Sequence, residues 1–270
     1  MPVLQDTNEL SPQRRSQERL RIGGLAQPWI GEIVPKVFRL GTTYVGCYVV
    51  EEAGVYTFID TGLPGYWQQI LGFLAMRNAP LSAVKAVVLT HSHVDHLGNA
   101  ERLRKEAVAR VLIHEADLAL ATRKASPPRW PFWRPRVLRY FLHALRGGAV
   151  QMLPVVEAST FVDGEILDVP GRPRVIHTPG HTAGHSAIHM EEREVLFVGD
   201  ALATIDIPTG EVGPRLMPRY MNDDYQAALQ SLRNIEDVRA GWVLAAHGMP
   251  WEGTPRQAVD FARRLVLGLT

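Results

Sequence analysis

Leu89-Thr-His-Ser-His-Val-Asp-His-Leu-Gly98 brings four side chains that can bind metals into six consecutive residues. They are His91, His93, Asp95 and His96. The apolar residues 86–89 that precede them have the composition of a buried strand, and the residues from 97 onward are typical of a helix. In α/β folds, the turn from the carboxyl end of a strand into a helix is a usual place for an active site. We therefore interpret the stretch as a metal-binding turn, and not as a polar surface turn with unrelated histidines.

The spacing within this turn predicts that its side chains point toward two neighbouring centres. His91 and His93 alternate along an extended backbone, so both side chains can face the same side. Asp95 and His96 follow where the chain turns, so they can point toward a second centre nearby. Three further polar residues each follow an apolar strand and lie beside a glycine, and we expect them at the same end of the sheet: His181, Asp200 and His247.

The composition is that of a soluble globular protein, with 46% hydrophobic and 21% charged residues in a chain of 270. This length allows one large domain or two small ones. The net charge of +1 gives no reason to expect nucleic acid or a membrane surface as a partner. Residues 1–28 are polar and arginine-rich without a secretory signal, and no run approaches the ~20 apolar residues of a membrane span. We expect a flexible arm over residues 1–28, a single domain over residues 29–270, no membrane span and a cytoplasmic location.

Short strands alternate with helices along the chain. We expect strands over residues 37–40, 44–51, 55–60, 84–90, 110–113, 166–169, 174–177, 186–190, 195–198 and 242–246, and helices over residues 64–77, 98–106, 115–123 and 136–146. Asn222 or Asp223 is expected to cap a further helix, and Thr254 to cap a last helix that begins at Pro255. The strands fall into two groups, which predicts two sheets packed face to face with helices outside. Cys47, the single cysteine, lies in one of these strands, so we expect a buried, inert thiol without a disulfide.

Residues 124–148 differ from the rest of the chain and predict a lid or insertion. Four prolines between residues 126 and 135 exclude a regular element there, and residues 123–146 contain seven Lys or Arg and no acid. The helix that follows is expected to place these side chains on one side: Val137, Tyr140, Phe141 and Leu145. We expect Trp130, Trp133, Arg134 and Tyr140 to contact the substrate, because aromatic rings suit an acyl chain and arginine binds phosphate or carboxylate. The substrate would then be a small, anionic and amphipathic molecule. The alternatives are a segment that only packs on the core and a segment that forms a homodimer contact.

The order and surroundings of these residues resemble the metallo-β-lactamase superfamily from about residue 36 to residue 252. The matching residues are His91, His93, Asp95, His96, His181, Asp200 and His247, with Asp60-Thr-Gly62 as the opening motif. The resemblance implies an αββα four-layer sandwich of two mixed β-sheets with helices on the outside. It also implies a two-metal site in which His91, His93 and His181 hold one metal, Asp95, His96 and His247 hold the other, and Asp200 bridges them. Asp60 either orients a ligand from behind or simply ends a strand, and His185 is expected to support the site rather than to bind a metal.

The chemistry of the donor set fits this two-metal site. Five imidazoles and two carboxylates suit two Zn²⁺ ions, and they suit iron or manganese as well. The resemblance implies a hydrolase of an ester, thioester or lactone, in which a metal-bridging hydroxide attacks the carbonyl and Asp95 assists the leaving group. The segments Thr178-Pro-Gly-His-Thr182 and Phe197-Val-Gly-Asp200 resemble the glyoxalase II-like members most closely.

Other activities of the superfamily stay open at this point. A mononuclear iron enzyme of the persulfide dioxygenase type resembles this chain at His91, His181 and Asp200. A phosphodiesterase or nuclease would use the same two-metal core, but the net charge of +1 disfavours it and we expect no nucleic acid partner. Asp200 argues against a dedicated antibiotic hydrolase, because the true β-lactamases have Cys or Ser at the matching position. Ala203 weakens a lactonase assignment, because the quorum-quenching lactonases carry a tyrosine at that position.

Overall fold

The computed structural model describes residues 26–122 and 135–269. Its first sheet begins as an antiparallel meander of β1 (Trp29–Val34), β2 (Val37–Gly41), β3 (Gly46–Glu52) and β4 (Val55–Ile59). Parallel pairing extends this sheet through β5 (Val84–Val88), β6 (Arg110–His114) and β7 (Ser159–Phe161). β-branched and aromatic residues are frequent in these strands, as expected for a pleated and largely buried surface. The first sheet is therefore mixed, and its strands follow the order of the chain.

The second sheet has the order β14-β13-β10-β9-β8 within the described residues. Its strands are β8 (Arg174–His177), β9 (Ser186–Met190), β10 (Val195–Gly199), β13 (Trp242–Ala245) and β14 (Trp251–Glu252). The pairing of β10 with β13 is parallel and the other pairings are antiparallel, so this sheet is mixed as well. A separate antiparallel pair consists of β11 (Ala203–Ile205) and β12 (Val212–Arg215).

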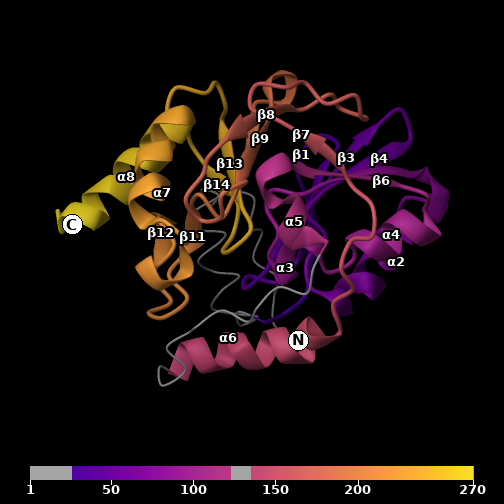
Figure 1. Cartoon of the computed structure of the whole chain (residues 1–270), viewed down its shortest axis with the longest axis horizontal. Helices are drawn as coiled ribbons and strands as arrows, with labels where there is room; N and C mark the ends of the chain where they lie inside the picture. The colour runs from indigo at the N-terminus through magenta and orange to yellow at the C-terminus, as the bar shows by residue number, and fades with distance from the viewer. Residues whose placement is uncertain (1–25, 123–134, 270) are drawn as a thin grey trace, which may run out of the picture.

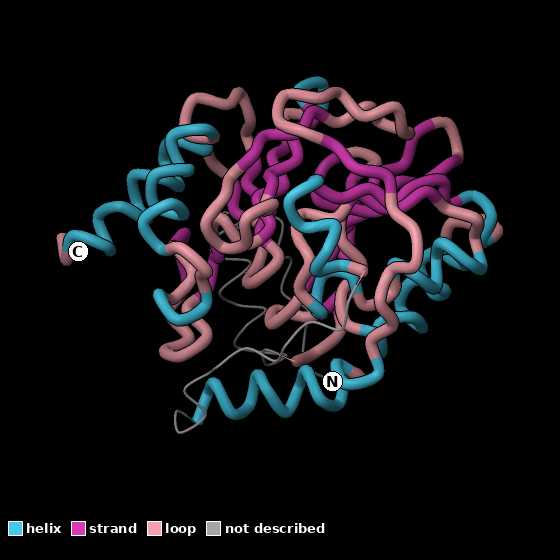
Figure 2. Tube along the Cα trace, in the orientation of Figure 1, coloured by secondary structure: helices cyan, strands magenta, loops and turns pink. Residues whose placement is uncertain are grey.

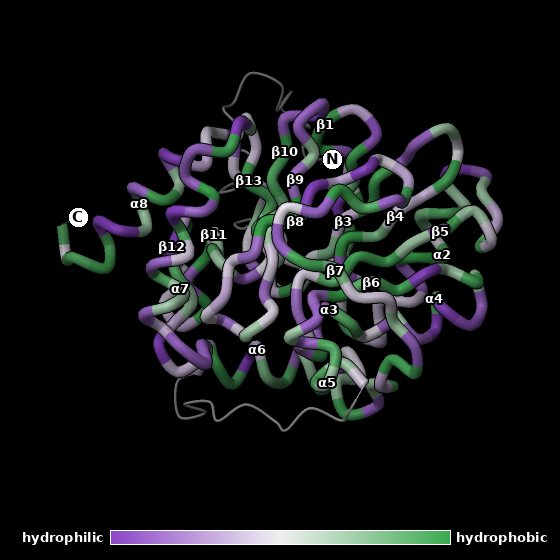
Figure 3. The backbone as a smooth tube through the Cα atoms, turned by 45° about the horizontal axis from the view of Figure 1, so that its top comes forward, coloured by the Kyte–Doolittle hydropathy of each residue, from purple (hydrophilic) through white to green (hydrophobic). Residues whose placement is uncertain are grey.

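Alternation along the strands divides the apolar side chains among layers. In β10, Phe197 packs between the two sheets, whereas Leu196 and Val198 pack on the outer side with helices α7 (Tyr225–Ser231) and α8 (Pro255–Leu267). In β4, Ile59 lies between the sheets, whereas Phe58 packs with α2 (Trp67–Met76) and α4 (Ala100–Glu106). Figures 1 and 2 show the two sheets with these helices on either side, and Figure 3 shows hydrophobic colours along the central strands. The predicted four-layer αββα architecture is confirmed.

The described residues contain three further α-helices: α3 (Val94–Leu97), α5 (Leu118–Ala121) and α6 (Pro135–Arg146). α6 does not belong to the outer layers but crosses the lower side of the molecule in Figure 1. Val137 and Tyr140 are buried on its inner face, whereas Leu145 is 37% exposed. The predicted apolar side of the helix is thus only partly buried, and Ala144 rather than Leu145 packs against the cluster formed with Tyr44.

Several other local predictions need correction. Asn222 and Asp223 do not cap α7; Asp224 does, and its side chain accepts hydrogen bonds from the backbone N–H groups of residues 226 and 227. Residues 166–169 form no strand but one isolated bridge between Ile166 and Arg174. The predicted start of the last helix is confirmed, because Thr254 forms a reciprocal capping box at the start of α8. No helix in the described part of the chain is long and apolar enough to cross a membrane.

Candidate metal centre

The turn that follows β5 carries the side chains of His91, His93, Asp95 and His96 into the interior. The strand ends at Val88, and α3 begins at Val94 after an extended backbone at His93. α3 has only one turn and contains Asp95 and His96, and the ring centroid of His96 lies 3.9 Å from that of His91. Asp95 and His96 are 7% and 1% exposed, so both polar groups have been taken out of water. Burial of this kind is costly unless the groups are paired or bind a cation.

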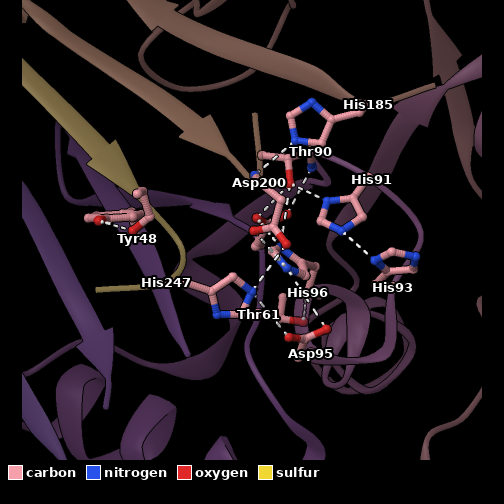
Figure 4. A network of polar contacts seen from close by, with 12 residues as sticks. Tyr48, Thr61, Thr90, His91, His93, Asp95, His96, His185, Asp200 and His247 are labelled. Atoms are coloured by element: carbon pink, nitrogen blue, oxygen red, sulfur yellow. Dashed lines mark hydrogen bonds and ion pairs between the residues drawn. The ribbon is translucent and has the colours of Figure 1, made fainter. Parts of the chain in front are cut away.

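Three residues from the second sheet meet this turn. His181 lies between β8 and β9, Asp200 directly follows β10, and His247 lies two residues after β13 ends. All three are at most 2% exposed. Figure 4 shows Asp200 and His247 directed toward the side chains of the first-sheet turn. The structure thus brings all seven side chains that the sequence singled out as metal ligands to one end of the sandwich, four from the first sheet and three from the second.

The seven side chains form overlapping groups. In each group, one nitrogen or oxygen atom per residue lies within 4.8 Å of the others, and the groups are His91 with His93 and His181, His91 with His96 and Asp200, and Asp95 with His96 and His247. Asp200 lies between the outer groups, because its Oδ2 is 3.2 Å from His181 Nε2 and 3.1 Å from His247 Nε2. Its Oδ1 is 3.5 Å from His96 Nε2. The carboxylate of Asp200 therefore lies close to imidazoles of both outer groups.

The nitrogen atoms of the first group converge closely. His93 Nδ1 lies 3.0 Å from both His91 Nε2 and His181 Nε2. Burial, reinforced by neighbouring histidines, holds the pKa of His91 well below its usual range. Burial also holds the pKa of His181 well below that range, although Asp200 opposes it. Neutral imidazoles present the lone pairs that a metal ion requires, so this group is suited to a cation.

Two buried atoms support the same interpretation at the shared carboxylate. Among the described residues, His96 Nε2 and Asp200 Oδ1 have no hydrogen-bond partner, although both face the centre. Burial would lower the pKa of His96, but the carboxylates of Asp200, Asp60 and Asp95 raise it to about 10. The carboxylates therefore favour positive charge at this point. A divalent cation would bind the unpaired nitrogen and oxygen atoms and would balance the negative charge of the carboxylates. The residues present therefore fit a metal.

Asp60 directly follows β4 and forms a hydrogen bond with the ring of His96. Its Oδ2 accepts the Nδ1–H of His96 at 2.8 Å, which fixes the tautomer and leaves Nε2 to face the centre. The two oxygens also accept hydrogen bonds from the backbone N–H and the hydroxyl of Thr90, both at 2.8 Å. The φ angle of 59° at Asp60 places it in the left-handed region, where it ends the strand β4 and turns its carboxylate toward the centre.

His185 is positioned to support Asp200. Its Nε2 accepts the backbone N–H of Asp200 at 2.9 Å, so Nδ1 carries the proton and donates to the hydroxyl of Thr178 at 2.8 Å. Burial lowers the pKa of His185 to about 4, which keeps the ring neutral in this role. Both ring nitrogens are therefore engaged in hydrogen bonds within the protein.

Asp117 is a further anchor of the centre that the sequence did not reveal. It is fully buried at the end of the short helical turn Glu115–Asp117, which follows β6. Its Oδ2 accepts the backbone N–H of Ser92 at 3.0 Å and the hydroxyl of Thr182 at 2.8 Å, and its Oδ1 accepts the N–H of Gly184 at 2.7 Å. It thus connects the turn of His91 with the turn of His181. The available signal was its place after an apolar strand, which Asp60 and Asp200 share.

Backbone contacts hold His247 on the opposite side. Its Nδ1–H donates to the carbonyl oxygen of Tyr44, which leaves Nε2 to face Asp200. The fully buried Arg39 donates through Nη2 to the carbonyl oxygens of Thr42 at 2.6 Å and Gly248 at 2.8 Å. The loop of His247 is therefore fixed to the loop between β2 and β3.

The predicted substrate contacts have different outcomes. Trp130, Trp133 and Arg134 lie outside the described residues and stay predictions. Tyr140 lies at the centre itself, where its hydroxyl donates to Asp95 Oδ2 at 2.7 Å. Burial and the neighbouring carboxylate of Asp95 raise the pKa of Tyr140 well above its usual range, so the phenol is protonated. The prediction for Cys47 is confirmed, because it is buried and burial raises its pKa to about 12.

An αββα sandwich with convergent imidazoles and carboxylates at one end defines a class of metalloenzymes. The profile of the metallo-beta-lactamase superfamily matches residues 40–247, and the chain therefore belongs to this superfamily. It is accordingly a metal-dependent hydrolase.

Relatives of known sequence or structure agree with this assignment. The probable metallo-hydrolase YflN of Bacillus subtilis is 28% identical over 214 residues, which cover 73% of this chain and 77% of YflN. An acyl-coenzyme A thioesterase of Gallus gallus is 29% identical over 158 residues, 53% of this chain and 52% of that protein. The crystal structure of a metallo-beta-lactamase family protein from Thermus thermophilus has a TM-score of 0.64 and 27% identity, and covers 87% of this chain and 81% of that chain.

Proposed function

We propose that this protein is a two-metal hydrolase whose substrate is a thioester, within the wider class of esters, thioesters and lactones. The observation that carries the proposal is the pair of ligand groups on either side of Asp200. His91, His93 and His181 would hold one cation, Asp95, His96 and His247 would hold the other, and Asp200 would contact both. Zn²⁺ suits this set of donors, and iron or manganese would suit it as well.

Two bound cations would supply an activated water at neutral pH and polarise the substrate carbonyl. The residues of the chain supply the remaining requirements. Asp60 and His185 hold His96 and Asp200 in fixed orientations. Asp95 accepts a hydrogen bond from Tyr140 of α6 and is only 7% exposed, and we assign it the role of assisting the leaving group. A thiolate is a good leaving group, and it needs little assistance from such a residue.

The thioester specificity rests on similarity and on the sequence of the segment 124–148. A relative with thioesterase activity in its name matches about half of this chain. The seven basic residues between 123 and 146 suit an anionic carrier attached to an apolar acyl group. Residues 123–134, which carry four of these seven basic residues, lie outside the described residues, so the anionic and amphipathic character of the substrate is part of the proposal.

Metal analysis and a substrate panel test the proposal together. Protein purified without an affinity tag or added metal should contain about two equivalents of zinc by plasma mass spectrometry. Acyl-coenzyme A substrates should be hydrolysed faster than p-nitrophenyl esters, lactones and bis(p-nitrophenyl) phosphate. One equivalent of iron with oxygen consumption in the presence of a persulfide would instead favour the oxidoreductase. A preference for the phosphodiester would favour the nuclease.

A further inference from the structure

Among the described residues of α6, Tyr140 contacts a proposed metal ligand directly. The hydroxyl of Tyr140 donates to Asp95 Oδ2 at 2.7 Å, and the residue is 4% exposed. Its ring packs edge-on against the rings of His247 and Tyr44, with centroid distances of 5.9 Å and 5.6 Å. The carbonyl oxygen of Tyr44 in turn accepts the Nδ1–H of His247. Tyr140 therefore contacts the group of Asp95, His96 and His247, which would hold the second metal.

Asp95 depends on this hydrogen bond more than the other carboxylates depend on any one partner. Asp60 accepts three hydrogen bonds, and Asp200 lies close to two imidazole nitrogens. For the carboxylate of Asp95, Tyr140 is the one hydrogen-bond donor that the described residues provide. The neighbouring Nε2 atoms of His247 and His96 are 3.6 Å and 3.9 Å from its oxygens. Without the phenol, no hydrogen bond from the described residues would fix the orientation of this carboxylate.

The rest of α6 is anchored by contacts that do not involve Asp95. His143 Nε2 lies 2.9 Å from the hydroxyl of Tyr66, which is 3.0 Å from the hydroxyl of Thr42. Just beyond the helix, the carbonyl oxygen of Gly147 accepts the N–H of Gly65 at 2.7 Å. Loss of the Tyr140 hydroxyl would therefore leave the helix in place, so the effect on the centre can be separated from detachment of the helix.

We propose that Tyr140 is a positioning residue for the second metal, which makes α6 part of that metal site and not only a cover over the substrate. This inference rests on the two-metal function proposed above. The phenol holds Asp95 Oδ2, so the orientation of the carboxylate toward His96 and His247 is set by a residue from a separate part of the chain. Removal of such a partner typically costs about 10- to 100-fold in metal affinity or activity.

The test compares Tyr140→Phe with the matched control Tyr66→Phe. Each variant loses one buried hydroxyl at the contact between α6 and the body, but only the first touches Asp95. Metal-free protein is titrated with Co²⁺, and binding is followed by visible absorption and by calorimetry. Tyr140→Phe should bind the first equivalent as the wild type does and the second about 10-fold or more weakly. Tyr66→Phe should bind both as the wild type does. With both sites filled, Tyr140→Phe should show a changed absorption spectrum and a lower kcat with little change in KM.

Three results would overturn the inference. The first is a second Co²⁺ equivalent that binds to Tyr140→Phe with wild-type affinity and spectrum. The second is an equal loss in Tyr66→Phe, which would assign the effect to the seating of the helix. The third is a wild-type protein that binds only one equivalent. That last result would remove the two-metal function as well, whereas the first two leave that function intact.

Discussion

Asp117 provides a strict test of how the metal centre is held, because its carboxylate connects two ligand-bearing turns without facing the metals. The substitution Asp117→Asn keeps the size of the side chain and removes its charge. The carboxylate accepts hydrogen bonds from Ser92, Thr182 and Gly184. An amide oxygen can replace only one carboxylate oxygen, and in either orientation the amide N–H₂ faces a backbone N–H. At least one hydrogen bond is therefore lost, and two donors are brought together in a fully buried place.

The expected loss of stability follows from these contacts. A hydrogen bond to a charged group contributes about 1.5–3 kcal/mol, and the remaining ones weaken when the charge is removed. We expect the free energy of unfolding of the metal-free protein to fall by about 3 kcal/mol. We also expect metal affinity to fall about 10- to 100-fold, because both turns lose their common anchor.

Urea unfolding of the metal-free protein and metal content after dialysis measure the two effects. Glu115→Gln is the matched control, because it makes the same chemical change at an exposed position of the same turn. It should alter the unfolding free energy by less than about 0.5 kcal/mol. If Asp117→Asn resembled Glu115→Gln in both measurements, the idea that Asp117 anchors the centre would be refuted.

Further measurements examine the metals, a supporting carboxylate and the response to acid. Dialysis against a chelator should abolish hydrolysis, and added Zn²⁺ should restore it in a rate assay; activity that survives complete metal removal would contradict the proposed function. Asp60→Asn should lower metal affinity about 10- to 100-fold in a competition titration, because the amide no longer fixes the tautomer of His96 as strongly. Although burial raises the pKa of Glu101, hydrogen bonds from Arg104 and the backbone N–H of Val156 lower it to about 2 from 4.5. Its contribution to the free energy of unfolding is therefore complete above pH 4.5 and is lost as the pH falls toward 2. In urea unfolding of metal-free protein, Glu101→Gln should therefore reduce the fall in the free energy of unfolding between pH 4.5 and pH 2. An unchanged pH dependence would show that Glu101 does not contribute to the acid sensitivity of the fold.

Periodicity and strand-end positions predicted the sandwich and the seven convergent side chains, because both are set by local sequence. Alternating apolar residues define the buried strands, and residues that follow such strands must lie at the edge of a sheet. Helix ends were less certain, and Asp224 caps α7 in place of its neighbours because the choice among adjacent polar residues depends on the path of the chain. For the same reason Leu145 could not be distinguished from Ala144 as the inward-facing residue of α6.

The long-range contacts of the centre could not be predicted. Tyr140 and Asp95 are 45 residues apart, and Asp117 and Gly184 are 67 residues apart. Nothing in either local sequence indicates that these pairs meet, since their proximity depends on how the two sheets and α6 pack. The substrate contacts at Trp130, Trp133 and Arg134, the homodimer and the cytoplasmic location stay predictions.

The proposed ligands come from both sheets, which would give bound metal a role in holding the protein together. Each proposed metal position takes two side chains from the turn after β5 and one from the second sheet. Neither sheet alone offers a complete set, so a metal can bind tightly only after the two halves have docked. By linkage, bound metal must then stabilise that docking, by about 2.7 kcal/mol when free metal is 100 times its dissociation constant. The same ions that would activate water would thus also stabilise the packing of the two sheets against each other. The loss of metal would weaken that packing.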